Sequence, residues 1–391
     1  MTEVDVHAEA HGLTMIGHSD LGGFGDGMQL ILDGDVLYVG HFGISGAGTS
    51  ILDAADSTRL RLVHQIPAPA GSHTHKVQVA NGLLLVNHEQ FRGGSPHSAG
   101  MAVFSLQDPF HPRQIGWFDS TGAGVHRIVW TGGRYAYLSA TPAGYNDRMW
   151  LIVDMSDPHR PVETGRWWWP GQLVEAEQPT WPPGRRYAAH HALLDGDIAY
   201  LGYGDANLVV LDVSDPTDPV LLANLQWQPG GDTHTCLPLP GRGLLVVTDE
   251  TVTDRCAGDK HLVRVVDVSD PTHPRLLSTC PEPEGDYCER GLRFGPHNTH
   301  ENIPGSYRSA ELVFVTYFNA GLRVYDISEA EHPSEVAYWV PPAPEGQEAI
   351  QINDVYVAAD LHIYVTDRLS GGVYVLRPDE HLAARMRAAA L

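Results

Sequence analysis

The sequence is poor in positive charge. It carries 25 lysines and arginines against 48 aspartates and glutamates, which gives a formal net charge of −23 at pH 7. Such a chain repels a phosphate backbone or an anionic lipid surface, and no basic stripe offsets the acidity locally. We therefore expect no nucleic-acid or membrane partner. A small-molecule substrate and a monomeric or weakly homo-oligomeric state fit better.

Long apolar runs are also missing. No window approaches the roughly 18 uninterrupted apolar residues that favour a membrane-spanning helix. The first residues, MTEVDVHAEAHG, are acidic and lack the apolar core of a secretory leader. These absences predict a cytoplasmic location.

Cysteine is scarce. The four cysteines fall in the second half of the chain and form no CxxC pair: Cys236, Cys256, Cys280 and Cys288. We expect small buried side chains with one loop bridge, such as Cys280 to Cys288, and a metal or redox role is the alternative.

Several catalytic motifs are absent as well. The sequence contains no Walker A loop, no GxGxxG after a strand, no HExxH and no GxSxG. Nucleotide cofactors and serine hydrolysis are therefore unsupported.

Repeats dominate what is present. The copies are LIVDMSDPHRP from Leu151, LVVLDVSDPTDP from Leu208, LVRVVDVSDPTHP from Leu262 and LRVYDISEAEHP from Leu322. Their aspartates, at positions 154, 212, 267 and 326, recur at the period of a propeller blade, although slightly long. A β-branched run favours a strand, and the Asp, Ser and Pro that follow favour a tight turn.

A second motif precedes each copy: a histidine, a short apolar segment, a Gly-rich or Asp-containing turn and a second apolar segment. Together the two motifs make four strands. We therefore predict an all-β fold, a seven-bladed β-propeller of four-stranded blades. It spans 1–391 as a single domain, with blades over 28–377, a closing N-terminal strand over 11–19 and a short C-terminal helix over 379–390.

The LVVLDVSDP-type copies resemble the LVIVD-repeat β-propeller family. The resemblance covers about residues 28–377 and implies the fold while saying little about activity. More distantly, and only in arrangement, histidines on inner propeller strands are similar to those of the selenium-binding protein (methanethiol oxidase) group and the carotenoid cleavage oxygenases. That likeness implies that such histidines hold a metal.

The first strand of each blade lines the centre of a propeller, so residues in equivalent positions converge at one mouth. Histidines occupy this position in five predicted blades, and a ring of imidazoles is costly unless it is paired or binds a metal. We therefore predict three or four metal ligands among His75, His126, His190 or His191, His234, and His297 or His300. The expected cofactor is a divalent transition metal, iron first, with Mn, Zn or Cu as alternatives.

The register leaves two positions open. His190 places Ala192 and Leu194 on its own strand face, so it fits slightly better than His191. The choice matters because a one-residue slip turns a strand's side chains to the other face.

Three charged residues are candidates for catalysis. Glu89 and Glu301 stand beside histidines and could orient ligands or transfer protons, or they could be solvated loop charges. Arg127 follows His126 and could anchor an anionic substrate, although pairing with a neighbouring blade's carboxylate is favoured.

The predicted function is a metal-dependent enzyme that acts on a small organic molecule at the propeller mouth, with a non-haem iron oxygenase as the first hypothesis. A metal-dependent hydrolase or lyase is the second. A noncatalytic propeller that binds a ligand or a protein is the rival from another class.

Overall fold

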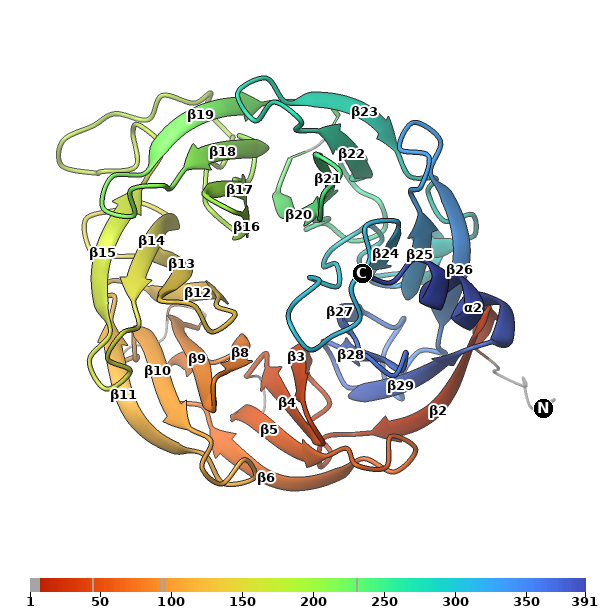
Figure 1. Cartoon of the computed structure of the whole chain (residues 1–391). Coiled ribbons are helices and arrows are strands. Elements are labelled where there is room, and N and C mark those ends of the chain that lie inside the picture. The colour runs from red at the N-terminus through yellow and green to blue at the C-terminus, as the bar shows by residue number, and fades with distance from the viewer. Residues whose placement is uncertain (1–7, 44–45, 92, 94–95, 230) are drawn as a thin grey trace.

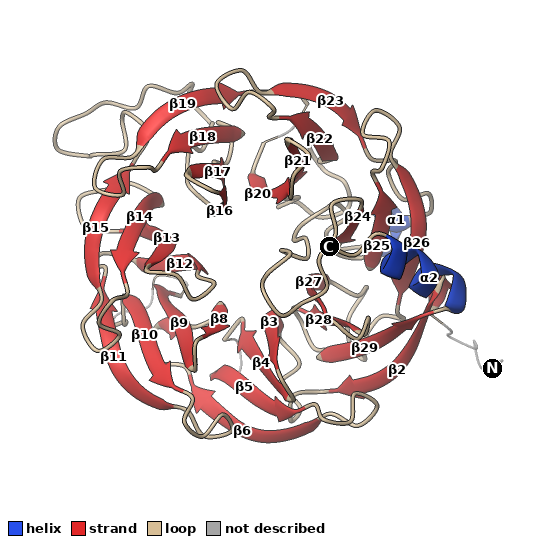
Figure 2. Cartoon of the chain, in the orientation of Figure 1, coloured by secondary structure: helices blue, strands red, loops and turns tan. Residues whose placement is uncertain are grey.

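The computed structural model describes residues 8–43, 46–91, 93, 96–229 and 231–391. In this part of the chain the structure is all-β apart from two short helices, α1 (Tyr287–Arg290) and α2 (Glu380–Ala388). Antiparallel sheets stand around a common axis like the blades of a propeller (Figures 1 and 2).

The sheets follow one another along the chain. The first sheet is β3 (Gly27–Asp33), β4 (Val36–His41), β5 (Ala47–Asp53) and β6 (Arg61–Pro67). The next two blades are β8 (Val77–Ala80), β9 (Leu83–Gln90), β10 (Gly100–Ser105) and β11 (Arg113–Asp119), then β12 (Gly124–Val129), β13 (Tyr135–Thr141), β14 (Met149–Asp154) and β15 (Val162–Trp167). These two blades form one larger sheet with β7 (Ser72–His73), because Gly124 pairs with Glu89.

Two regular four-stranded sheets come next. They are β16 (His191–Asp195), β17 (Ile198–Gly202), β18 (Leu208–Asp212) and β19 (Val220–Leu225), then β20 (Thr233–Leu239), β21 (Leu244–Asp249), β22 (Val263–Asp267) and β23 (Arg275–Thr279). Each pairs its strands in chain order, as the two sequence motifs predict.

The last two sheets include strands from the N-terminal end. One contains β24 (Leu312–Thr316), β25 (Leu322–Asp326), β26 (Ser334–Val340) and β1 (Glu9–His11). The other contains β27 (Ile352–Val357), β28 (Ile363–Asp367), β29 (Val373–Pro378) and β2 (Leu13–Ser19). The N-terminal strand predicted over 11–19 therefore pairs with the last strand of the chain, except that His11 belongs to the preceding sheet. Gly12, with a φ of 72°, turns the chain between the two.

The repeat motif forms the turn expected from its chemistry. The aspartate that ends each third strand accepts a hydrogen bond from the backbone N–H two residues later, at 2.7 Å for Asp154, 2.8 Å for Asp212 and 2.9 Å for Asp267. This side-chain bond satisfies a backbone donor that the ladder no longer serves. The second aspartate of the motif repeats the arrangement, as in the 2.9 Å bond from Thr217 N to Asp215.

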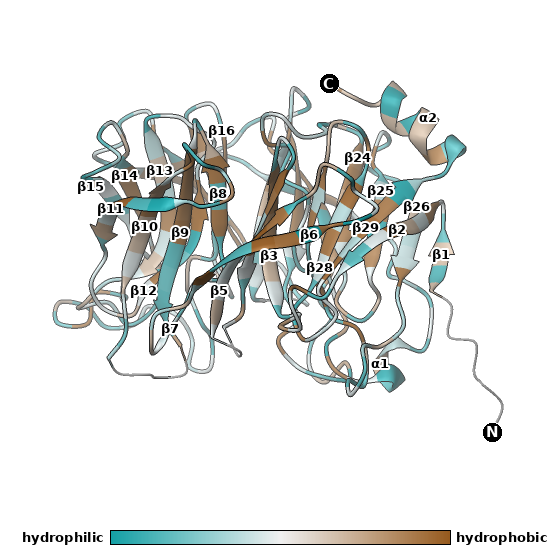
Figure 3. Ribbon diagram, turned by 90° about the horizontal axis from the view of Figure 1, so that it is seen from below, coloured by the Kyte–Doolittle hydropathy of each residue, from teal (hydrophilic) through white to brown (hydrophobic). Residues whose placement is uncertain are grey.

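The C-terminal helix is also present. Asp379 caps α2 by accepting from the backbone N–H of Leu382 at 2.8 Å. Leu382 and Met386 are buried against the sheets. The helix lies at one end of the ring, and α1 and β7 lie at the other end (Figure 3).

The cysteines differ from the prediction. Cys256 and Cys288 form a disulfide across a sequence separation of 32, whereas Cys280, the predicted partner of Cys288, is free and buried, as is Cys236. Structural disulfides persist mainly in oxidising compartments. The predicted cytoplasmic location is therefore wrong. That prediction rested on the absence of a leader pattern, which is weaker evidence about the compartment than a disulfide. Among the described residues, no helix has the length and apolarity to cross a membrane.

We predict that the Cys256→Ser and Cys288→Ser double variant loses about 2–4 kcal/mol of unfolding free energy, because the bridge no longer restricts the unfolded chain. Urea denaturation without reductant measures the loss. Thiol titration of the unfolded, unreduced wild type should find the two thiols of Cys236 and Cys280. Four titratable thiols, or equal stability of both proteins, would contradict the bridge.

Candidate metal centre

A β-bulge stands at the head of several inner strands. The ladder register shifts by one residue between Val125 and Arg127 and between Thr233 and Thr235, so His126 and His234 are the extra residues. The same shift occurs around Met28 and Asn353 in two other blades. A bulge re-aims side chains that regular alternation would place on opposite faces. The histidine and the residue after it can therefore both approach the axis.

The histidines form a continuous arc. Ring centroids lie 5.0 Å apart for His75 and His126, 4.8 Å for His126 and His190, 3.6 Å for His190 and His234, and 4.2 Å for His234 and His297. The five predicted positions therefore meet, and in both uncertain blades it is the earlier histidine that joins the arc.

Two residues outside the predicted set complete this group. His73 extends the arc, with its ring centroid 4.0 Å from that of His75. Glu250 lies near His234 and His297, with carboxylate oxygens 3.9 Å and 3.7 Å from their Nε2 atoms. The alternation of histidines in His73-Thr74-His75 was the available signal for His73. Glu250 follows a strand end and carries no motif of its own.

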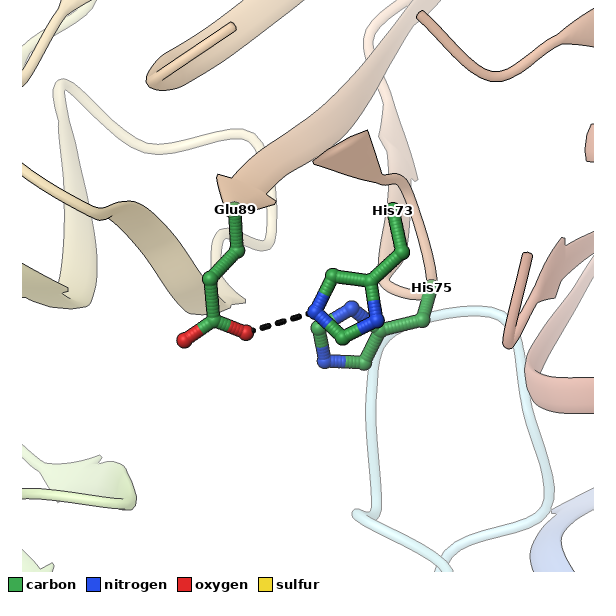
Figure 4. A group of neighbouring side chains, drawn as sticks. All are labelled: His73, His75 and Glu89. Atoms are coloured by element: carbon green, nitrogen blue, oxygen red, sulfur yellow. Dashed lines mark hydrogen bonds and ion pairs between the residues drawn. The ribbon is translucent and has the colours of Figure 1, made fainter. Parts of the chain in front are cut away.

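The arc spans two groups of three that have metal-ligand geometry. His73, His75 and Glu89 form the first (Figure 4), and His190, His234 and Glu250 form the second. In each group one ligand atom per residue lies within 4.8 Å of the others. His126 joins the two groups, since its Nδ1 is 2.8 Å from Glu89 and its Nε2 is 3.0 Å from Nε2 of His190.

Glu89 holds two imidazoles in place. One of its oxygens accepts from Nε2 of His73 and from Nδ1 of His126, both at 2.8 Å. Burial alone would raise the pKa of Glu89, but the contacts with His126 and His73 hold it well below its usual range. The donation from His126 Nδ1–H leaves its Nε2 with a lone pair, so in the absence of metal His190 supplies the proton of the 3.0 Å contact.

Buried nitrogens without partners mark this arc. Among the described residues, six histidine ring nitrogens have neither solvent access nor a hydrogen bond. Four of them belong to the arc, namely His73 Nδ1, His75 Nε2, His190 Nδ1 and His234 Nε2, and the other two, His191 Nε2 and His261 Nδ1, lie outside it. Such atoms cost free energy unless something binds them. Burial also lowers the pKa of His75, His190 and His234 well below the usual value, so these rings are neutral at pH 7 and can donate lone pairs to a metal.

His300 does not join the arc. Its Nε2 donates to the carbonyl of Tyr307 at 2.6 Å, and its Nδ1 accepts from the backbone N–H of Val357 at 3.2 Å. Both nitrogens are therefore engaged by backbone groups, and His300 has none left for a metal. It has a structural role in holding the loop that replaces a regular inner strand in its blade.

His191, Arg127 and Glu301 lie beyond the arc, further along the axis. Arg127 donates to Glu301 at 2.5 Å, and Nε2 of His191 is 3.4 Å from the same carboxylate oxygen. Arg127 thus pairs with a carboxylate as favoured, but with one from across the ring rather than from the neighbouring blade. Lys76 and Asp354 are buried in the same layer, and burial lowers the pKa of Lys76 and raises that of Asp354, each to about 7.

The arc opens on a small pocket. Its volume is about 320 Å³, near the lower end for small-molecule sites, and it is lined by Phe42, His73, Glu89, His126, Arg148 and Arg186, among others. Arg368, which follows β28, lies near two aromatic rings, with its guanidinium 5.4 Å from the ring centroid of Phe42 and 5.6 Å from that of Phe318.

The long insert after β15 packs on itself. The ring of Trp169 lies 5.0 Å from that of Tyr187 and 6.2 Å from that of Tyr203, and Trp181 stacks on Tyr187 at 5.4 Å. At its end, Arg186 reaches the pocket and forms two hydrogen bonds with Asp147, at 2.7 and 2.9 Å.

Comparisons with known proteins agree with this architecture. The LVIVD repeat model matches residues 123–167, 189–226 and 256–281. The chain is similar in structure to the periplasmic gluconolactonase PpgL of Pseudomonas aeruginosa, with 15% identity, a TM-score of 0.55, and coverage of 85% of this chain and 96% of that one. No curated protein matches in sequence.

At 15% identity the structural likeness shows the fold alone. The chain is a β-propeller protein. The match of the LVIVD repeat model to three segments confirms the resemblance seen in its sequence motifs. The name of PpgL describes that protein as periplasmic.

We predict that Arg127→Met lowers the unfolding free energy by about 3–5 kcal/mol, because it leaves the carboxylate of Glu301 buried without its partner. Adding Glu301→Gln to this variant should restore part of the loss. The matched control is Arg134→Met, which breaks an exposed pair with Asp154 and should cost less than about 1 kcal/mol. Urea denaturation measures all three, and equal losses for the two arginine variants would contradict a buried pair.

Proposed function

We propose that the protein is a metal-dependent hydrolase that acts on a small organic molecule at the pocket beside the histidine arc. The observation that carries this proposal is the set of buried, unpartnered imidazole nitrogens beside two carboxylates. A metal ion is the partner that such neutral nitrogens and carboxylate oxygens suit.

The architecture of this enzyme is part of the proposal. The sheets correspond to seven blades in one domain over 1–391, and the pairing of β2 with β29 closes the ring. Closure would leave the inner strand heads at fixed positions around one axis, which a site assembled from several blades requires.

The second group, His190, His234 and Glu250, is the primary site in this proposal. Glu250 is held by Arg293 at 2.9 Å, and burial is outweighed there by nearby cationic groups, so its pKa is lowered to about 2 and it remains an anionic ligand. Nδ1 of His234 contacts the hydroxyl of Thr235 at 2.9 Å, which fixes the ring and leaves Nε2 free.

A metal bound there would polarise a carbonyl group and lower the pKa of a bound water. The side chains of the protein would transfer protons and orient the substrate. Glu89, which is ionised and hydrogen-bonded to His126, is positioned to accept a proton through that ring, and the pocket walls orient the substrate.

Hydrolysis is preferred to the oxygenase that the sequence first suggested, because no comparison supports an oxygenase. The name of the structural neighbour makes lactones the first substrates to test. The donor set suits Zn, Mn, Fe or Cu and does not select among them. A noncatalytic ligand-binding propeller is the second candidate, favoured by the small size of the pocket.

We predict that protein purified without a His-tag and exposed anaerobically to Fe(II), Mn(II) or Zn(II) retains about one equivalent of metal, measured by elemental analysis. His190→Ala and His234→Ala should each lose it, because each removes a ligand nitrogen. The control is His273→Ala, which removes an exposed histidine that contacts Asp270 and should leave the metal content unchanged.

Metal content below about 0.2 equivalents in the wild type, or equal content in all the variants, would refute the metal centre. The metal-loaded protein should also release acid from a lactone panel in a pH-stat. Full metal occupancy with no turnover of any lactone or ester would favour the noncatalytic candidate.

A further inference from the structure

The pocket beside the arc contains an arginine whose charge is not matched. Arg148 directly precedes β14 and is only 9% exposed. Its backbone is anchored, since its carbonyl accepts from the N–H of Ala189 at 2.9 Å and from Nε2 of Gln172 at 3.0 Å. The position of the side chain at the pocket wall therefore does not depend on a partner for the guanidinium.

The guanidinium itself lacks a close acceptor among the described residues. Its Nε is buried without a hydrogen bond, and the nearest paired carboxylate oxygen, on Asp147, is 3.9 Å away. Asp147 is already engaged by two hydrogen bonds from Arg186. A buried cation without an acceptor is costly, which indicates that another anion compensates it.

A second guanidinium is in a similar state. Nη1 of Arg368 is buried without a hydrogen bond, and the nearest carboxylate oxygen, on Glu250, is 3.8 Å away. The carboxylates of the mouth have other partners, because Glu89 accepts from two histidines and Glu250 accepts from Arg293. The anion that Arg148 lacks is therefore not supplied by these neighbouring residues.

We propose that the substrate carries a carboxylate group and that the guanidinium fork of Arg148 binds it. Arginine suits this contact because its planar N–H groups match two carboxylate oxygens at once. A monoanion fits better than a phosphate dianion, since the carboxylates of Glu89, Asp147 and Glu250 lie near the Arg148 guanidinium and would repel a second negative charge. The aromatic ring of Phe42 lines the same pocket, so the carboxylate is expected on a small, partly apolar molecule.

This inference rests on the proposed function only in treating the bound carboxylate as a substrate. Its test measures binding alone and uses metal-free protein. After treatment with EDTA, calorimetric titration compares benzoate with its neutral analogue benzamide. Benzoate should bind and benzamide should bind about tenfold more weakly or not at all, because only the anion pairs with the guanidinium.

Arg148→Gln should weaken benzoate binding by about tenfold or more, and Arg148→Lys, which keeps the charge but loses the fork, should weaken it less. The control Arg134→Gln, at an exposed arginine paired with Asp154, should bind benzoate as the wild type does. If Arg148→Gln does not fold, the Arg148→Lys variant is the test. Wild-type benzoate affinity in that variant would contradict binding by the guanidinium fork.

Equal binding of benzoate and benzamide, or unchanged affinity in Arg148→Gln, would overturn the carboxylate site. Binding of phenyl phosphate about tenfold tighter than benzoate would show that the site prefers a phosphate group and would contradict the carboxylate proposal. Benzoate binding by a protein that takes up no metal would leave this inference standing while the hydrolase proposal fails.

Discussion

The candidate site depends on the bulges at the heads of the inner strands. A regular strand would send His126 and Arg127 to opposite faces, so that one of each such pair would pack between blades. The extra residue lets an inner strand such as β12 contribute two polar side chains to the axis, one at the level of the arc and one beyond it. His126 in the arc and Arg127 in the buried layer, like Asn353 and Asp354, are thus placed by the same kind of local distortion.

Charge balance then determines which of these groups can react. The Arg127–Glu301 pair is compensated and surrounded by protein, which suits it to holding the blades together. The mouth is less balanced, since it combines unpaired imidazole nitrogens with incompletely paired guanidinium groups. In a chain with a net charge of −23, this concentration of arginines is local, and screening by salt keeps the distant acidic surface from cancelling it.

The sequence was sufficient for the repeating parts of this structure. Strand ends such as Asp154 and Asp212 carry their own turn chemistry, so strand order and the convergence of five histidines followed from spacing alone. The sequence did not predict contacts that occur once in the structure and are not repeated from blade to blade. His300 resembled a ligand, but its nitrogens are engaged by Tyr307 and Val357 through a loop whose path no periodicity encodes. The pairing of Cys256 with Cys288 likewise depends on how two irregular loops meet.

The pairing of β2 with β29 has a consequence for biosynthesis. The Nε2–H of His18 donates to the carbonyl oxygen of Gly371, 353 positions later, at 2.7 Å. A ribosome makes β2 early and its partner strand late, so the first outer strand must wait with its edge unpaired while the intervening sheets form. Assembly of the last sheet is therefore a late event in translation, and any ligand set that needs every blade in place is completed after it.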